Sequence, residues 1–220
     1  MANFVSTLDG VVSYGLPDRA AASFISAGNE ADRFVLGLLR ACADAIIVGA
    51  GTLRQERDHI WTPDFVYPEA SAEFAEMRQA RGQPAHALVV FVSAGGNVDR
   101  SAPVFSSGIP VRVVTGRRSA DEIVAESGGG LLVCEGGPKL LGLFVRERRL
   151  DELFLTLAPQ VAGRAPGAQR LGLVEGQAFT PAEARWAALV TLKRSGDFVF
   201  SRYRFATSAS RAIDSPREGA

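Results

Sequence analysis

Short apolar runs alternate with stretches of helical periodicity along most of the chain. The apolar runs predict strands at 3–6, 45–48, 87–92, 111–115, 131–134 and 152–157. The periodic stretches predict helices at 29–42, from the turn at 49–52 to about 57, and at 69–81, 119–126 and about 138–148. Residues 11–28 are rich in small residues and predict a loop, and residues 58–84 are less regular.

This alternation predicts the α/β class, with a largely parallel central sheet that helices flank on both faces. Two further runs, 187–193 and 198–205, predict a C-terminal antiparallel hairpin that turns near 195–197. We expect one domain over 1–206, followed by a disordered tail at 207–220, because those last residues are small and polar.

The composition excludes several classes of function. Lys plus Arg and Asp plus Glu both count 24, which gives no net charge and argues against broad binding to nucleic acid or an acidic membrane. Two cysteines and two histidines are too few for a disulfide framework or a His-rich metal site, so no metal is expected. The start of the chain shows no signal peptide and no run reaches a membrane span, so a cytoplasmic location is expected.

The candidate chemistry lies in two glycine turns, each of which joins a predicted strand to a predicted helix. The first is 48–52 (VGAGT) and the second is 134–139 (CEGGPK). Free amide groups at a helix start favour a phosphate or pyrophosphate, and glycines let the backbone approach such a ligand. Neither turn matches a standard nucleotide-binding fingerprint, so ordinary strand–helix packing is an alternative for each of them.

The residues around these turns resemble a known family, the reductase domain of bacterial riboflavin biosynthesis, which has the dihydrofolate-reductase-like fold. The similar segments, in order, are 2–10 (ANFVSTLDG), 32–35, 38–40, 43–54 (ADAIIVGAGTLR), 132–141 (LVCEGGPKLL) and 150–159 (LDELFLTLAP). The segments between 32 and 54 count as one motif, which makes four; each is weak alone, whereas four in register over about 2–205 are specific.

The resemblance implies an NADPH-dependent oxidoreductase, commonly a homodimer, with NADH as the second candidate cofactor. Its riboflavin members reduce a phosphorylated ribosylaminopyrimidine, so the leading activity is reduction of 5-amino-6-(5-phosphoribosylamino)uracil. Carried over by position, the cofactor-binding residues are Gly49, Ala50, Gly51, Thr52, Glu56, Ser93, Gly136, Gly137, Pro138, Lys139, Leu140 and Leu141. The substrate-binding residues are Asn3, Ser23, Arg40 and Glu135, and the catalytic candidates are Glu135 and Asp9.

The chemistry of a hydride transfer agrees with this assignment, because the cofactor reacts while the protein orients it and excludes water. Glu135 would hydrogen-bond an amino or imino group, and Arg40 would clamp a phosphate or carboxylate. Each residue also has a structural alternative. Asp9 suits a turn, Arg40 a helix C-terminus or a surface ion pair, and Glu135 a helix cap. His59 and Trp61 suit packing, although either would line the pocket if the 58–66 loop folds over it.

The sequence departs from the family pattern at two positions. Thr62 stands where relatives often carry an arginine that binds the substrate phosphate, and no basic residue follows Ser93 at the strand end. Arg54, Arg117 or Arg118 would then have to contact a cofactor 2′-phosphate. Three alternatives therefore remain beside the leading activity: a dihydrofolate-type or other small-heterocycle reductase, a nucleotide-binding module without catalysis, and a ligand-free dimerisation module.

Overall fold

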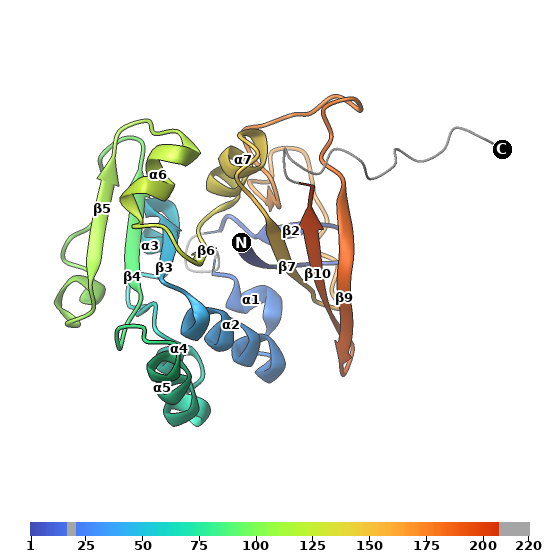
Figure 1. Cartoon of the computed structure of the whole chain (residues 1–220). Helices are drawn as coiled ribbons and strands as arrows, with labels where there is room; N and C mark the ends of the chain where they lie inside the picture. Colours follow the sequence, from blue (N-terminus) through green and yellow to red (C-terminus); the bar gives the residue numbers. More distant parts are fainter. Residues whose placement is uncertain (17–20, 207–220) are drawn as a thin grey trace.

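The computed structural model describes residues 1–16 and 21–206. Its main feature is an eight-stranded sheet in the order β5-β4-β3-β6-β1-β7-β10-β9 (Figure 1). The strands are β1 (Ala2–Ser6), β3 (Ala45–Gly49), β4 (Leu88–Ser93), β5 (Val111–Thr115), β6 (Leu132–Cys134), β7 (Glu152–Leu157), β9 (Ala187–Ser195) and β10 (Phe198–Phe205). From β5 to β7 all neighbours pair in parallel, whereas β10 is antiparallel to both β7 and β9. The predicted α/β class, the parallel sheet and the terminal hairpin are confirmed.

Two of the predicted helices begin within one residue of the expected position, because capping side chains fix their first turns. The Asn29 side chain accepts a hydrogen bond from the Asp32 amide at the start of α2, and Ser119 and Glu122 form a capping box at the start of α6. The predicted helices correspond to α2 (Glu30–Cys42), α3 (Ala50–Gln55), α5 (Ser71–Ala80), α6 (Ala120–Glu126) and α7 (Pro138–Arg146). No helix of the described ranges has the length and apolar character that a membrane crossing requires.

The prediction of a loop over 11–28 is wrong in two places within its described part. Residues 11–13 form β2 (Val11–Ser13), which pairs with β8 (Leu171–Gly172), and α1 (Ser23–Ser26) follows. Both are short, and the partner of β2 lies far along the chain, so local periodicity contains no signal for either.

Short helices were also not predicted in the less regular segments. They are α4 (Pro63–Val66), η1 (Pro68–Ala70) and η2 (Pro103–Ser106). Because η1 occupies the stretch before Ser71, α5 begins two residues later than expected. The tail expected at 207–220 lies outside the described residues.

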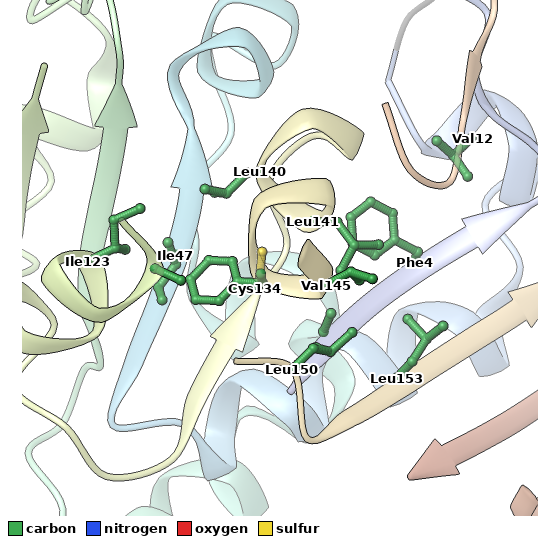
Figure 2. Close-up of a cluster of buried hydrophobic side chains, with 13 residues drawn as sticks. Phe4, Val12, Ile47, Ile123, Cys134, Leu140, Leu141, Val145, Leu150 and Leu153 are labelled. Atoms are coloured by element: carbon green, nitrogen blue, oxygen red, sulfur yellow. The ribbon is translucent and has the colours of Figure 1, made fainter. Parts of the chain in front are cut away.

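The core covers both faces of the central strands. Within β3, Ile47 packs in one cluster with Cys134 and α7, whereas Ile46 and Val48 pack in another cluster with Trp61. Figure 2 shows the first cluster, in which Leu140 and Leu141 of α7 lie beside Phe4 and Ile47. Because both faces are covered, the carboxyl ends of β3 and β6 are the part of the sheet that remains accessible. Ligands bind at these strand ends in such folds.

Candidate functional site

A cavity of about 1410 Å³ opens at the carboxyl ends of the central strands. Its walls come from β1, the ends of β3 and β4, Glu135 just after β6, the start of α7, the inner face of α2 and the 50–66 segment. Most residues expected to bind cofactor or substrate line it: Asn3, Ser23, Arg40, Gly49, Ala50, Gly51, Thr52, Glu56, Ser93, Glu135, Gly137, Pro138, Lys139 and Leu140. The fold therefore brings together segments that are more than 130 residues apart.

The two glycine turns lie against each other on one wall of this cavity. A Cβ atom added to Gly136 would lie 2.0 Å from the backbone nitrogen of Gly49, so no side chain fits there. A Cβ atom added to Gly137 would lie 3.7 Å from Thr52 Oγ1, and Gly137 has a positive φ of 44°. Together the turns form a single glycine-lined wall, over which one extended ligand would contact both.

Three of the expected site residues do not line the cavity. Gly136 is covered by the backbone of β3, and Leu141 points into the core, where its amide donates to the carbonyl of Gly137 at 3.2 Å. The carboxylate of Asp9 accepts hydrogen bonds from the Thr7 hydroxyl and from the amides of Ala162 and Gly163. The Thr7 hydroxyl is the largest contribution that lowers the pKa of Asp9 to about 2. Its geometry is that of a turn residue, the alternative left open above.

Arg40 and Glu135 form a buried ion pair at the floor of the cavity. Arg40 Nη2 lies 2.7 Å from Glu135 Oε2, Arg40 Nε lies 3.0 Å from Oε1, and the two side chains are 2% and 6% exposed. The remaining N–H groups of Arg40 face the carbonyls of Ile60 and Thr62 and the imidazole of His59. All five donors of the guanidinium are thus engaged, so Arg40 positions Glu135 and has no donor free to clamp a substrate phosphate.

His59 connects this pair to a second carboxyl, Glu56. His59 Nε2 lies 2.9 Å from Arg40 Nη2, and because arginine only donates, Nε2 must be the acceptor and Nδ1 carries the hydrogen. Nδ1 lies 3.6 Å from Glu56 Oε2. Burial, with a smaller contribution from the Arg40 charge, lowers the pKa of His59 to about 3, so the ring stays neutral.

Burial raises the pKa of Glu56, and the nearby charge of Arg40 opposes that shift only in part. Glu56 Oε1 accepts a hydrogen bond from the Ala22 amide at 3.4 Å. A half-buried carboxyl at a cavity wall whose pKa is raised is a candidate proton donor.

The 58–66 segment folds over the cavity, so that His59 lines the cavity as well as packing against its neighbours. Trp61 lines the cavity but is only 2% exposed and makes an edge contact with Phe91 in the core, so both of its proposed roles apply. Thr62 is buried, and its hydroxyl caps α4 by accepting from the Phe65 amide. The position of the family arginine is therefore a helix cap here.

Basic side chains gather at the other end of the cavity, near Ser93. Arg54 and Arg117 lie at this end, because Arg54 and Ser93 both contact the Asn97 carbonyl and Gly116 donates to the Ser93 carbonyl. Lys139 lines the cavity at the start of α7, and none of the three side chains has an ion pair among the described residues. Arg118, by contrast, pairs with Glu122 at 3.1 Å. The Ser93 hydroxyl donates to the carbonyl of Asn97.

Sequence reasoning missed Asp32, which also lines the cavity and is 9% exposed. An acid in the first turn of a helix ordinarily complements the helix dipole, so nothing marked this one as part of a site. Its spacing of eight residues from Arg40, with Leu36 between them, was the available signal, because residues four apart share a helix face.

Comparison with known proteins shows the family. The model of the RibD C-terminal domain matches residues 1–192. A pyrimidine reductase-like protein from Corynebacterium diphtheriae is 19% identical, with a TM-score of 0.66 over 93% of this chain and 90% of that one. RibD from Acinetobacter baumannii is 17% identical, with a TM-score of 0.69 over 94% of this chain and 57% of that one.

A Thermotoga maritima diaminohydroxyphosphoribosylaminopyrimidine deaminase and 5-amino-6-(5-phosphoribosylamino)uracil reductase is 18% identical, with a TM-score of 0.66. That alignment covers 93% of this chain and 56% of that one, so the chain spans little more than half the length of these two larger relatives. No curated protein matches the sequence. The matched family model spans most of the sequence, and the chain belongs to the RibD C-terminal domain family.

Proposed function

We propose that the chain is an NADPH-dependent reductase that transfers hydride to a pyrimidine-like heterocycle, with 5-amino-6-(5-phosphoribosylamino)uracil as the leading candidate substrate. The observation that carries the proposal is the single wall formed by the two glycine turns beside the Arg40–Glu135 pair. The cavity volume of about 1410 Å³ exceeds the roughly 300–1,000 Å³ of a site for one small ligand. It leaves room for a dinucleotide and a second ring.

The residues present fit a dinucleotide. The glycine-lined wall offers a close approach to the backbone beside the start of α7, where Pro138 occupies the first position and needs no partner for an amide. Arg54, Arg117 and Lys139 would hold the 2′-phosphate that distinguishes NADPH from NADH. These three side chains replace the basic residue that is missing after Ser93.

The nicotinamide supplies a hydride, and reduction of an imine also consumes one proton. Glu135, fixed by Arg40, accepts a hydrogen bond from the ring-attached nitrogen and stabilises positive charge on it. Glu56 supplies the proton to that nitrogen, since burial raises its pKa above that of an ordinary glutamate and so makes its carboxylic acid form more accessible. Neutral His59 holds Glu56 and Arg40 in one chain of contacts.

Calorimetric titration with NADPH and NADH tests the cofactor. We expect saturable binding with a preference for NADPH, and we expect Arg117→Gln to reduce that preference by about tenfold or more, the effect of losing one charge-assisted hydrogen bond. Arg118→Gln is the matched control, because Glu122 already neutralises Arg118. Absence of saturable binding of either nucleotide at millimolar concentration would defeat the proposal.

Turnover assays that follow the loss of NADPH absorbance identify the substrate class. Oxidation of NADPH with the phosphoribosylaminouracil supports the leading candidate, and oxidation with dihydrofolate instead supports the alternative reductase. Binding of NADPH without oxidation across a panel of heterocycles would leave a nucleotide-binding module as the better description.

We also propose that the protein is a homodimer that pairs through β9. This strand ends the sheet and pairs only with β10, so one edge of its backbone is unpaired within the described chain. Trp186, Leu189 and Leu192 are 72%, 52% and 61% exposed on and beside it. Clustered exposed apolar side chains of this size are typical of a protein–protein contact.

A further inference from the structure

Arg78 is a buried arginine of α5 that lies outside the cavity. It is only 2% exposed and has no ion pair among the described residues. Its guanidinium is directed at the carboxyl end of α2, where Nη1 lies 2.8 Å from the carbonyl oxygen of Ala43, 3.1 Å from that of Ala41 and 3.4 Å from that of Arg40. Nε donates to the carbonyl of Pro84 at 2.8 Å. One side chain therefore ties the last turn of α2 to the segment that follows α5.

The end of α2 depends on this contact, because the chain there lacks the usual means of closing a helix. The last carbonyls of a helix have no partner within it, and a glycine of positive φ commonly follows to satisfy them. Here Ala43 follows α2 in an extended conformation, with φ −71° and ψ 141°. The side-chain amide of Gln83 donates to the carbonyl of Cys42 at 3.0 Å, so Arg78 and Gln83 together cover the carbonyls of residues 40–43.

A second contact, one turn earlier, holds α2 against α5 (Figure 1). Gly37 is buried within α2, and a Cβ atom added there would lie 2.9 Å from the ring of Phe74 and 3.4 Å from the carbonyl oxygen of Pro63. Phe74 and Arg78 are four residues apart, so they share one face of α5. Two successive turns of α2 are thus fixed by that face.

Stability alone does not account for an arginine at position 78. Nη2 is buried and has no hydrogen-bond partner among the described residues. Burial also lowers the pKa of Arg78, because the charge loses hydration. Unsatisfied buried donors are rare in native chains, and local costs of this kind occur mainly where function requires the arrangement. What the guanidinium secures is the position of the last turn of α2.

That turn carries Arg40. The carbonyl oxygen of Arg40 faces Arg78, while its side chain holds Glu135 and donates to His59 at the floor of the cavity. We propose that Arg78 is a positioning residue for the proposed reductase: through the last turn of α2, it fixes where Arg40 places Glu135 beside the substrate. This deepens the proposed function and rests on it. Arg78 does not line the cavity, so it acts only through Arg40.

The tautomer of His59 reports the position of Arg40 without an assay of turnover. In the unmodified protein Arg40 donates to Nε2, which keeps the hydrogen on Nδ1. We expect ¹⁵N NMR spectra of the imidazole at pH 7 to show this tautomer, and we expect Arg78→Met to shift the ring toward the Nε2–H tautomer. Gln79→Met is the control, because Gln79 is the exposed neighbour in α5, and His86, the other histidine, gives the reference signal.

A residue that only stabilises the fold would lower the melting temperature and leave the tautomer of His59 unchanged. A folded Arg78→Met protein that keeps the Nδ1–H tautomer therefore overturns the proposal. If Arg78→Met does not fold, Arg78→Lys replaces it, because the single nitrogen of lysine cannot face Pro84 and the end of α2 together. A folded Arg78→Lys protein with an unchanged tautomer and an unchanged kcat overturns the proposal equally.

Turnover of NADPH with 5-amino-6-(5-phosphoribosylamino)uracil tests the consequence for the reaction. We expect Arg78→Met to lower kcat by about tenfold to a hundredfold, the effect of a displaced catalytic group, while the KM for NADPH changes by less than about twofold. In a Glu135→Gln background the same substitution should change the residual kcat by less than about twofold, since no carboxylate is left to position.

An equal loss of kcat in both backgrounds would indicate general damage to the fold and overturns the proposal. The NMR comparison separates this inference from the proposed function. Absence of NADPH binding and turnover in the unmodified protein defeats the proposed function, whereas a His59 tautomer that does not respond to Arg78 defeats this inference alone.

Discussion

At the scale of single residues, the position of Arg40 on a helix predicts little about what the side chain does. Its residue type suggested a clamp for a substrate phosphate, but its donors are all directed at Glu135, His59 and two carbonyls. Arg40→Met should lower the free energy of unfolding by about 3–5 kcal/mol, the cost of leaving one member of a buried ion pair without its partner. Urea denaturation at neutral pH measures this.

The double variant Arg40→Met/Glu135→Met separates lost pairing from lost packing. Replacing both members of a buried pair by apolar side chains of similar volume is often neutral for stability. The double variant should therefore recover most of the stability that Arg40→Met loses, while reductase activity stays low. A single variant that costs less than about 1 kcal/mol would contradict the ion pair as the dominant contribution.

His59 makes stability depend on pH in a definite direction. Its pKa is about 3 in the folded chain against an ordinary value of 6.5, so the unfolded chain takes up a proton first as the pH falls. This histidine therefore stabilises the fold above pH 6.5, and the contribution is lost as the pH falls toward 3. As the pH falls from 7 to 5, protonation of this histidine in the unfolded chain should lower the free energy of unfolding by about 2 kcal/mol.

His59→Gln should flatten this part of the pH dependence, since glutamine does not titrate. Unfolding free energies of both proteins at pH 7 and pH 5 give the comparison, and His86→Gln is the control because that histidine is exposed. If the unmodified protein and His59→Gln lose the same stability between the two pH values, the buried neutral imidazole is not the cause.

At the scale of elements, the sequence of the two strand–helix turns is restricted by the close approach of their backbones rather than by charge. Gly136→Ala places a Cβ atom 2.0 Å from the backbone nitrogen of Gly49, so β3 and β6 must move apart. We expect a loss of cofactor affinity of at least tenfold, together with a lower melting temperature, because backbone atoms on both sides cannot shift independently.

Gly95→Ala is the control for stability in that experiment, because nothing lies within 4 Å of the added atom and the residue needs no positive φ. Its melting temperature should stay close to that of the unmodified protein, because surface substitutions at positions without a special backbone conformation rarely change stability. If Gly136→Ala binds NADPH normally, the juxtaposition of the two turns does not form the cofactor site.

The elements that the sequence predicted are those whose pattern of apolar residues can be recognised within the segment itself. Residues 45–48 form a continuous apolar run because β3 is covered on both faces, and that pattern is sufficient to predict it. By contrast, β2 depends on β8, about 160 residues later, and no periodicity within three residues records such a partner. The family resemblance indicated most of the cavity wall, while the burial of Asp32 and the pairing of His59 depend on contacts between distant segments.

At the scale of the whole molecule, the exposed side chains on and beside β9 predict an assembly. Leu192 is 61% exposed in one chain, so Leu192→Glu should leave the fold intact but bury a charge if two copies meet there. Light scattering after size-exclusion chromatography should show a dimer for the unmodified protein at tens of micromolar, and at least a tenfold weaker dimer for Leu192→Glu. Leu8→Glu is the control, because Leu8 is equally exposed, at 61%, but lies outside β9. A monomeric unmodified protein, or a dimer indifferent to Leu192→Glu, would contradict pairing through this strand.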